Sequence, residues 1–448
     1  MTQDRALFRS KLGVILATAG SAVGMGNIWR FPYEAGQNGG AAFILIYIAC
    51  VVALGVPAML CEFILGRHGR TNASRAYGGW PWKGVGYMGV LTGFIIMGFY
   101  SVVAGWSLQY VFAALTGQLT GDVDAINRYF TAFVSHPVKP LLWTVAFMLL
   151  THAIIANGVQ RGIERVGKLM MTVLLALLVV LVVCSLCLPG SWAGVEFLFK
   201  PDFSKVDATV VFEALGQTFF SLSIGMAALC TYASYFSRQT NLARSAVQIV
   251  AIDSMVAILS GLMIFPAAFS VGVAPDSGPS LIFITLPNVF SQAFAAVPAV
   301  GYVMALLFYT LIAIAALTSI ISMHEVPTAF VAEEMRIGRK AAATIVTTVA
   351  VIVGMLCSLS MGPLPQLSLL GRNLFDFFDF LTANILLTLG GFLTCIYVGW
   401  VVPTRIIYTQ LTNWGTLRIG FYRLFIVAVR YVCPLAILII FLHQFGLM

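Results

Sequence analysis

The chain has 448 residues, of which 60% are hydrophobic and 9% are charged, and its mean hydropathy is +0.95. This composition excludes an ordinary soluble domain and predicts a polytopic helical membrane protein. The short segments of alternating polarity that a membrane β-barrel needs are not visible. The net charge of +8 requires no nucleic-acid partner, because basic residues gather beside anionic lipid on the cytoplasmic face of membranes.

Long apolar segments follow one another along the chain. We place eleven of them, near residues 12–36, 40–66, 84–116, 140–157, 168–188, 209–236, 243–273, 296–332, 341–359, 374–402 and 425–445. A cytoplasmic N-terminus puts 18 basic residues inside and 6 outside, with Arg430 at a span edge, which accounts for all 25. The positive-inside rule therefore predicts a multi-pass protein with its N-terminus inside and its C-terminus outside, and we expect it in a plasma membrane of the bacterial cytoplasmic (inner) type.

The first segment is interrupted in its middle. Residues 13–40 form an apolar stretch of membrane length that contains Gly20, Gly24 and Gly26. A helix broken at that depth leaves backbone N–H and C=O groups that hydrocarbon cannot satisfy, so something polar must meet them. Ions and a small zwitterion are the natural candidates.

The sixth segment carries a similar interruption. Hydroxyl groups and glycine lie at mid-depth between Ser221 and Gly225. Paired interruptions in corresponding five-span halves predict an inverted-repeat transporter, whose half-helix N–H groups can bind a carboxylate and whose carbonyls can bind a cation. The alternative is that these small residues only permit close helix packing. Asn27 and Gln217, which lie in the same two segments, favour the transporter.

Asp253 lies inside the seventh segment. An ionised carboxylate at the centre of a membrane helix costs roughly 2.5 kcal/mol or more, so we expect a compensating partner. The alternative is a neutral, protonated Asp253 that makes a hydrogen bond between helices.

One motif in the first segment resembles the first-span signature of the neurotransmitter:sodium symporters, especially of their bacterial amino-acid transporters. It runs GSAVGMGNIWRFPY from Gly20 to Tyr33, and the resemblance continues at residues 38–43, 231–235 and 315–319. It implies the all-α membrane fold named for the bacterial leucine transporter, with discontinuous helices 1 and 6. Residues 1–190 would form the first inverted repeat, residues 191–402 the second, and residues 403–448 the eleventh span outside the repeat.

The resemblance also implies two sodium sites built from carbonyls and neutral side chains. The first would comprise Ala22, Asn27, Ser221 and the substrate carboxylate, and the second Gly20, Val23, Ala315, Thr318 and Ser319. Sets of oxygen ligands suit a weakly held hard cation. The family has an asparagine ligand near the position of Asp253 and, one turn later, a chloride-binding serine or an acidic residue. Here the later residue is Ala257, so we expect Asp253 to supply both oxygen and negative charge, and chloride to be unnecessary.

Two gates follow from the same resemblance. Arg30 and Asp379 would form the extracellular ion pair, above an aromatic lid of Tyr100 and Phe220. Arg5 and Glu333 would close the cytoplasmic side, where Glu333 stands in place of the expected aspartate. For Arg5, a role as a positive-inside anchor is an equal alternative.

The implied substrate pocket combines both breaks with the third and eighth segments. Its residues are Ala22, Gly24, Gly26, Ile96, Tyr100, Phe220, Ser221, Ser223, Met226, Ser319 and Met323. None carries a charge, and the methionines offer an adaptable apolar wall. We expect a neutral hydrophobic or aromatic L-amino acid, with other small neutral amino acids as the alternative.

Other classes of function fit less well. A channel would need a ring of like residues or a repeated filter, and an enzyme would need a paired acid and base or a metal cluster. Neither pattern is visible, and a membrane receptor without transport would leave the oxygen clusters without a purpose.

One departure from the family concerns release of the second sodium: Thr172 stands where many relatives have a proline, and it retains the N–H group that proline lacks.

Overall fold

The structure is a computed structural model that describes residues 6–119, 123–272, 281–295 and 297–444. Within that part, nine helices are long and apolar enough to cross a membrane, and one further pair of helices is bent by 57° at a short break. The pair coincides with the predicted first segment. The predicted sixth segment is occupied by two shorter helices separated by turns, so the described spans agree with the expected arrangement.

The elements follow each other along the chain, with η4 a 3₁₀ turn and the other η elements π-helical turns. In the first half they are α1 (Lys11–Ala22), η1 (Gly26–Arg30), α2 (Phe31–Gln37), α3 (Ala41–Cys50), η2 (Val51–Gly55), α4 (Val56–Gly69), α5 (Ala73–Ala76), α6 (Lys83–Leu115), α7 (Val123–Val134), α8 (Lys139–Ala156), η3 (Val159–Glu164), α9 (Arg165–Leu186), α10 (Trp192–Phe199) and η4 (Phe203–Lys205).

In the second half they are α11 (Ala208–Ser221), α12 (Ala228–Ala233), α13 (Leu242–Ser270), η5 (Leu281–Thr285), α14 (Leu286–Ala293), α15 (Pro298–Glu334), α16 (Arg339–Ser360), β1 (Ser368–Leu369), β2 (Arg372–Asn373), α17 (Leu374–Phe380), η6 (Leu381–Leu386), α18 (Leu387–Ile396), η7 (Tyr397–Val401), α19 (Thr404–Leu411), α20 (Tyr422–Val427), η8 (Ala428–Val432) and α21 (Cys433–Gln444). The two short strands pair antiparallel, with Ser368 opposite Asn373.

One predicted boundary is wrong: the fifth span begins at Val159 rather than near residue 168. Its first turns are polar, and hydropathy therefore misses them. Glu164 lies in these turns, and its buried carboxylate accepts hydrogen bonds from Arg9 N (2.8 Å) and from Ser10 N and Oγ. The start of this span thus holds the segment before α1 in place through hydrogen bonds.

Polar side chains set the starts of several helices. Ser10 accepts a hydrogen bond from Gly13 N at the start of α1, and Asp207 and Asn241 cap α11 and α13 in the same way. Such caps satisfy N–H groups that the first turn leaves free. They fix where the broken and neighbouring spans enter the bundle.

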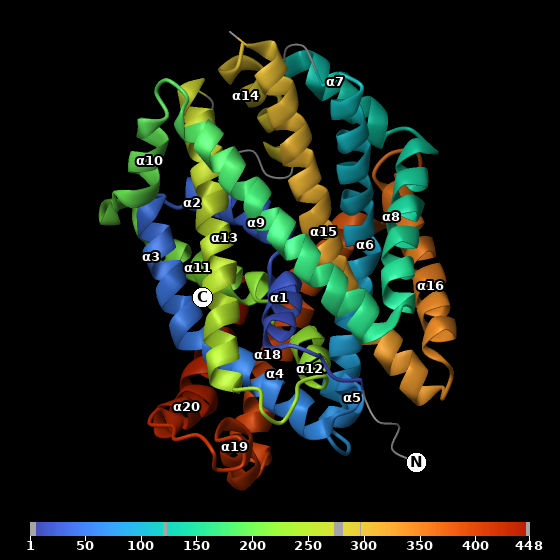
Figure 1. Cartoon of the computed structure of the whole chain (residues 1–448), viewed down its shortest axis with the longest axis vertical. Coiled ribbons are helices and arrows are strands. Elements are labelled where there is room, and N and C mark those ends of the chain that lie inside the picture. The colour runs from blue at the N-terminus through green and yellow to red at the C-terminus, as the bar shows by residue number, and fades with distance from the viewer. Residues whose placement is uncertain (1–5, 120–122, 273–280, 296, 445–448) are drawn as a thin grey trace.

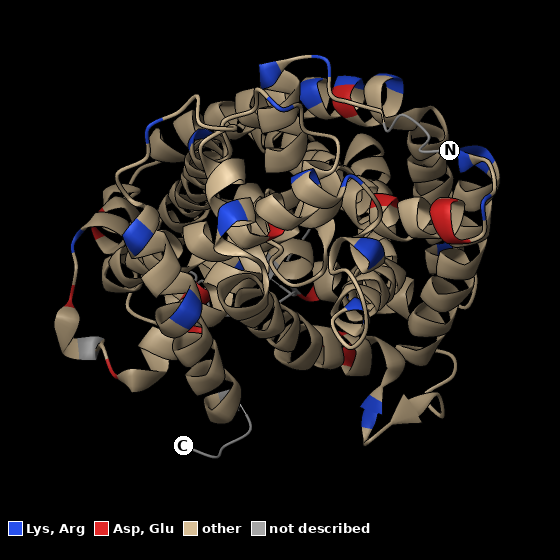
Figure 2. Ribbon diagram, turned by 90° about the horizontal axis from the view of Figure 1, so that it is seen from below, with Lys and Arg blue, Asp and Glu red and all other residues tan. Residues whose placement is uncertain are grey.

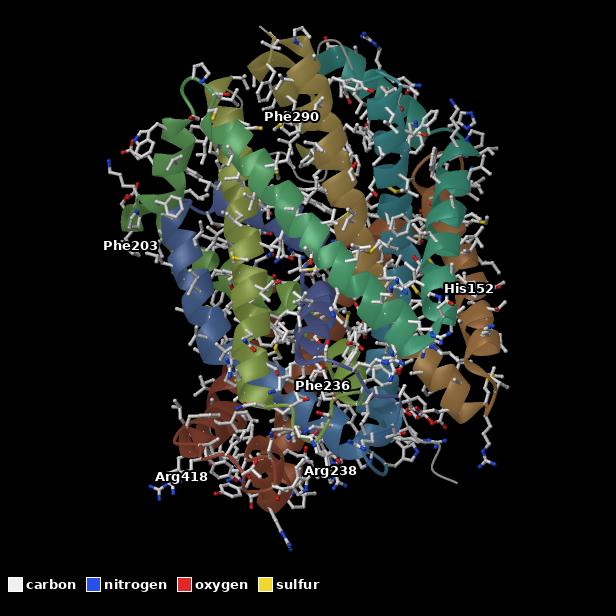
Figure 3. The ribbon with its side chains drawn as sticks, viewed as in Figure 1. His152, Phe203, Phe236, Arg238, Phe290 and Arg418 are labelled. Carbon is white, nitrogen blue, oxygen red and sulfur yellow. The ribbon has the colours of Figure 1, made fainter. Side chains whose placement is uncertain are left out.

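The broken spans lie inside the bundle. α1 contacts α9, α12, α13 and α15 and lies at the centre of the view in Figure 1. α6, α8, α15 and α16 pack against one another beside them. Apolar side chains fill the interior, which includes the fully buried rings of Phe43, Phe63 and Phe236, and Phe236 is labelled in Figure 3.

Candidate functional site

The predicted break in the first span is present. α1 ends at Ala22, Val23 N still donates to Ala19 O (2.7 Å), and helical structure resumes at Gly26. The freed backbone groups find partners nearby, because Gly24 N donates to Asn27 Oδ1 (3.0 Å) and Met25 N donates to Tyr100 Oη (3.4 Å). Gly24 lies so close to α15 that an added Cβ would collide with Ser319 Oγ.

The second break separates α11 from α12. Its backbone turns through three residues of positive φ, namely Ser223 (55°), Gly225 (95°) and Ala227 (60°). Glycine suits the middle position because its missing Cβ would collide with Leu387 O. The two breaks meet where Ser223 Oγ donates to Ser21 O (3.2 Å).

A buried carboxylate that the sequence analysis did not single out stabilises this second break. Glu62 on α4 is fully buried and accepts hydrogen bonds from Gly225 N (2.8 Å) and Cys230 N (3.1 Å). These are backbone groups that an interrupted helix leaves without a partner. A lone acidic residue in the second apolar segment was the available signal.

The first predicted ion site is a connected polar network. Asn27 Nδ2 donates to Asp253 Oδ1 (2.7 Å) and to Ser221 Oγ (3.2 Å), and Ser221 Oγ donates to Asp253 Oδ2 (2.8 Å). Tyr47 on α3, which the sequence analysis missed, donates its hydroxyl to the same carboxylate oxygen (3.2 Å). All four side chains are buried. Asp253 therefore has the compensating partners that its position requires.

Gln217 behaves differently. Its buried side-chain amide makes no hydrogen bond to any described residue, although its polarity contributed to the prediction of a site in this span. Ala22 is buried and is the last residue of α1, directly before the break.

The second predicted ion site joins the first break to α15. Thr318 Oγ1 and Ser319 Oγ both donate to Val23 O (3.3 Å each), and Thr318 Oγ1 also donates to Ala315 O (2.9 Å). An added Cβ on Gly20 would be 3.4 Å from Thr318 Cβ. The five predicted residues therefore lie together, and carbonyl and hydroxyl oxygens are the ligands that a hard monovalent cation can use.

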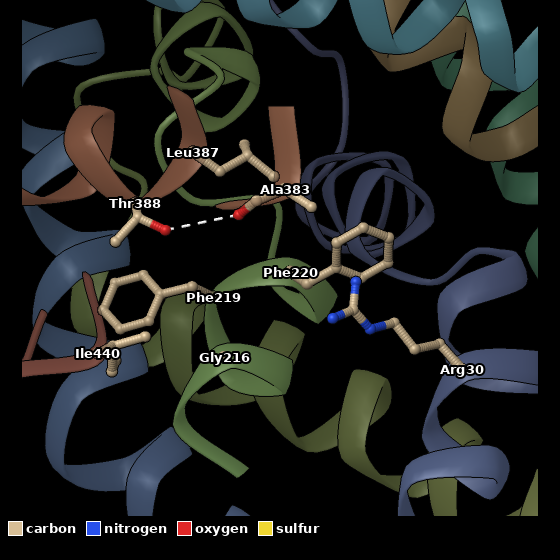
Figure 4. A pocket seen from close by; sticks show the side chains of 8 residues that line it. All are labelled: Arg30, Gly216, Phe219, Phe220, Ala383, Leu387, Thr388 and Ile440. Atoms are coloured by element: carbon tan, nitrogen blue, oxygen red, sulfur yellow. Dashed lines mark hydrogen bonds between the residues drawn. The ribbon is translucent and has the colours of Figure 1, made fainter. Parts of the chain in front are cut away.

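The predicted substrate pocket draws residues from α6, α15 and both breaks. Ile96, Met226 and Met323 are buried and apolar, and an added Cβ on Gly26 would lie 2.9 Å from the Phe220 ring. Phe220 also lines a small cavity of about 20 Å³, together with Arg30, Phe219 and Thr388 among others, and Figure 4 draws the residues that line it.

The predicted gates are only partly assembled in this conformation. Arg30 pairs with Glu34 (3.6 Å). Its guanidinium also lies 4.4 Å from the centre of the Phe220 ring, and Figure 4 shows these two side chains side by side. No ion pair between Arg30 and Asp379 is found among the described residues. At the other end Arg5 lies outside the described residues, whereas Glu333 accepts hydrogen bonds from Thr71 Oγ1 (2.9 Å) and Asn72 N (2.7 Å).

A second network at that end joins Phe8 and Tyr235, which the resemblance also places at the cytoplasmic closure, to an ion pair that was not predicted. Arg339 forms an ion pair with buried Glu325, and Tyr235 donates its hydroxyl to the same carboxylate (2.5 Å). Phe8 packs against this region, since Phe8 N donates to Tyr235 O (3.1 Å) and its ring stacks on Tyr232. These contacts join the N-terminal segment to α12, the second helix of the sixth span, and to the residues that follow it.

Comparison with known proteins gives a consistent result. The model of the sodium:neurotransmitter symporter family matches residues 5–132 and 132–447. The sodium-dependent transporter YhdH of Bacillus subtilis is 38% identical over 445 residues, which cover 98% of this chain and 97% of the relative. A sodium-dependent transporter of Haemophilus influenzae is 34% identical over 459 residues, with 99% and 98% covered.

Among solved structures, the crystal structure of MhsT in complex with L-phenylalanine matches with a TM-score of 0.88 at 40% identity, over 98% of this chain and 99% of that one. This match confirms the predicted fold with its discontinuous helices. Together with the family model and the relatives, it shows that the chain belongs to the sodium:neurotransmitter symporter family of sodium-dependent membrane transporters and is not an enzyme.

Proposed function

We propose that the protein is a sodium-coupled symporter that imports neutral L-amino acids with apolar or aromatic side chains by alternating access, without a requirement for chloride. The observation that carries this proposal is the meeting of two broken helices at buried oxygen clusters. Ser223 links the breaks through Ser21 O, and the Asn27–Asp253 contact lies beside them. Broken half-helices around a central site are the arrangement that secondary transporters use for ions and substrate.

The first sodium would be held by Ala22, Asn27, Ser221 and the substrate carboxylate, with Asp253 adjacent. Asp253 accepts three side-chain hydrogen bonds, which suits an ionised carboxylate because that group only accepts. Its negative charge offsets the charge of the cation in a medium where ions interact strongly. An external chloride is then unnecessary. The second sodium would lie at the Val23–Thr318 cluster.

The substrate headgroup would lie at the first break. The absence of a side chain at Gly24 brings the backbone of the break beside Ser319 and Tyr100. The N–H groups there, which donate to Asn27 Oδ1 and Tyr100 Oη in this structure, would be the donors to the carboxylate. The apolar wall of Ile96, Met226 and Met323 favours a hydrophobic or aromatic side chain. The complex of the similar MhsT with L-phenylalanine supports the same substrate class.

Access would alternate through the two gates. Arg30 and Asp379 would pair when the outer side closes, and Arg5 and Glu333 when the cytoplasmic side closes. Exposed ion pairs contribute only about 0–1 kcal/mol, which suits contacts that must break in every cycle. We place the protein in a bacterial cytoplasmic membrane with its N-terminus inside, and the two repeats, residues 1–190 and 191–402, would move against each other.

A binding screen tests this proposal. Purified protein is equilibrated with each of the twenty amino acids in sodium chloride, sodium gluconate and potassium gluconate. We expect binding of L-phenylalanine and similar neutral amino acids in both sodium salts and loss of binding in potassium. Binding that is equal in potassium would contradict sodium coupling, and binding confined to sodium chloride would contradict independence of chloride.

A further inference from the structure

A second, strongly basic pocket lies at the end of the molecule that carries α5, α19 and α20. Its volume is about 560 Å³, and Arg67, His68, Arg70, Arg238, Arg405 and Trp414 lie among its lining residues. None of the described residues that line it is acidic. Figure 2 looks onto this end of the molecule, and Figure 3 labels Arg238 there.

One of these cations is fixed in place without any carboxylate. Arg67 is almost fully buried at 2% exposure, and its guanidinium donates to Gln410 Oε1 (2.7 Å), Thr240 O (2.6 Å) and Asn413 Oδ1 (3.0 Å). All these acceptors are neutral, and no ion pair of Arg67 is found within the described ranges. Its positive charge is therefore held in position but is not cancelled, which is a costly arrangement unless an anion adds to it.

The other arginines that line the pocket are Arg70, Arg238 and Arg405. The guanidinium groups of Arg67 and Arg238 lie 5.4 and 5.2 Å from the Trp414 ring, so this aromatic residue positions two charges at once. Arg70 and Arg405 are exposed and join the same lining. Basic side chains in such number attract a phosphate group by charge and by hydrogen bonding.

The surroundings of the pocket resemble a membrane–water interface. α19 buries Ile407 and Leu411 and exposes Tyr408, while Trp414 and Leu424 on the same end are also exposed. Aromatic and basic side chains together mark the level of lipid headgroups, and basic pockets beside membrane helices bind phosphorylated lipid headgroups. A soluble phosphate would gain nothing from these apolar side chains.

We propose that this pocket binds the phosphate-bearing headgroup of an anionic glycerophospholipid from the adjacent leaflet. Naming that leaflet as cytoplasmic rests on the proposed orientation, but the binding itself does not depend on the transport function. A lipid bound only by the folded protein raises its thermal stability by mass action.

The experiment measures lipid binding to the full-length protein in detergent, without transport. Phosphatidylglycerol, phosphatidylcholine and inorganic phosphate are titrated separately, and the shift in thermal unfolding gives each apparent Kd. The test variant is Arg70→Gln/Arg405→Gln, which changes exposed residues of the pocket lining. The matched control is Arg418→Gln/Arg423→Gln, which removes two exposed charges of the same end that do not line the pocket.

We expect phosphatidylglycerol to bind the test variant roughly 30-fold more weakly than the unchanged protein, because the two lost charges line the pocket and act directly on the bound headgroup. The control variant should bind within about threefold of the unchanged protein. Equal weakening in both variants, or equal binding of phosphatidylcholine, would overturn the proposal. Tight binding of inorganic phosphate without lipid binding would show a soluble-anion site and would also overturn it. Unfolding of the lipid-free variants at the temperature of the unchanged protein excludes misfolding as the cause.

Discussion

Replacing Asp253 by asparagine removes the one charge in the first ion site and keeps nearly the same shape. The carboxylate is fully buried and lies 2.7 Å from Asn27 Nδ2 and 2.8 Å from Ser221 Oγ. If a sodium ion in this site and the carboxylate are separated by about 4 Å, the two unit charges attract by about 4 kcal/mol at an effective dielectric constant of about 20.

Asparagine keeps one oxygen and so recovers part of that attraction. We therefore expect Asp253→Asn to weaken sodium binding by roughly 100-fold, which corresponds to about 2.7 kcal/mol. Ser221 and Tyr47 can turn their hydroxyl groups to accept from the new amide, which limits the loss of folding stability. The assay is a sodium titration of L-phenylalanine binding to purified protein, with gluconate as the anion.

The same substitution site tests the role of charge against chloride. With Asp253→Ser, chloride should restore part of the sodium affinity, and gluconate should not. Ser260→Ala, on the same helix, is the matched control because its hydroxyl only bonds back to Val256 O. Unchanged sodium affinity in Asp253→Asn would refute the charged role and would favour a neutral Asp253.

Three further predictions concern the two breaks. Asn27→Ala should weaken the binding of sodium and of substrate together, because linkage between two binding sites is reciprocal. Thr318→Ala should weaken sodium binding first. Parallel titrations of sodium and substrate separate these results, and unchanged sodium dependence in both variants would refute the assignments. Gly24→Asp should weaken the binding of L-amino acids more than the binding of the corresponding decarboxylated amines. Gly24→Ala is the control for the collision with Ser319 Oγ. Retained L-leucine binding in a folded Gly24→Asp protein would show that the substrate carboxylate lies elsewhere. Glu62→Gln should lower the free energy of unfolding by about 1–3 kcal/mol, because one of two buried N–H groups loses its acceptor; an unchanged thermal midpoint would contradict that role.

The sequence was a good guide to the spans and to the breaks. Ten of the predicted segments agree closely with the described helices because hydrophobic length decides them, and glycine and hydroxyl groups reveal the interruptions. The start of the fifth span was misplaced, since its polar first turns are buried against residues far away in the chain, to which Glu164 is hydrogen-bonded. Such contacts leave no local pattern.

Side-chain partners were harder to predict. Glu62, Tyr47 and the Arg339–Glu325 pair each depend on helices brought together only by the fold. The partners of Arg30 also depend on the fold, because its side chain pairs with Glu34 one turn away and at the same time lies over the Phe220 ring of another helix. Residue types therefore indicated where polar groups lie, whereas the tertiary structure decides which of them meet.

The most direct test of the account is uptake of radiolabelled L-phenylalanine into proteoliposomes that contain the purified protein and no chloride. An inward sodium gradient should drive accumulation above the external concentration, and dissipating that gradient or replacing sodium by potassium should abolish it. Accumulation that proceeds equally without a sodium gradient, or that begins only when chloride is added, would contradict the account.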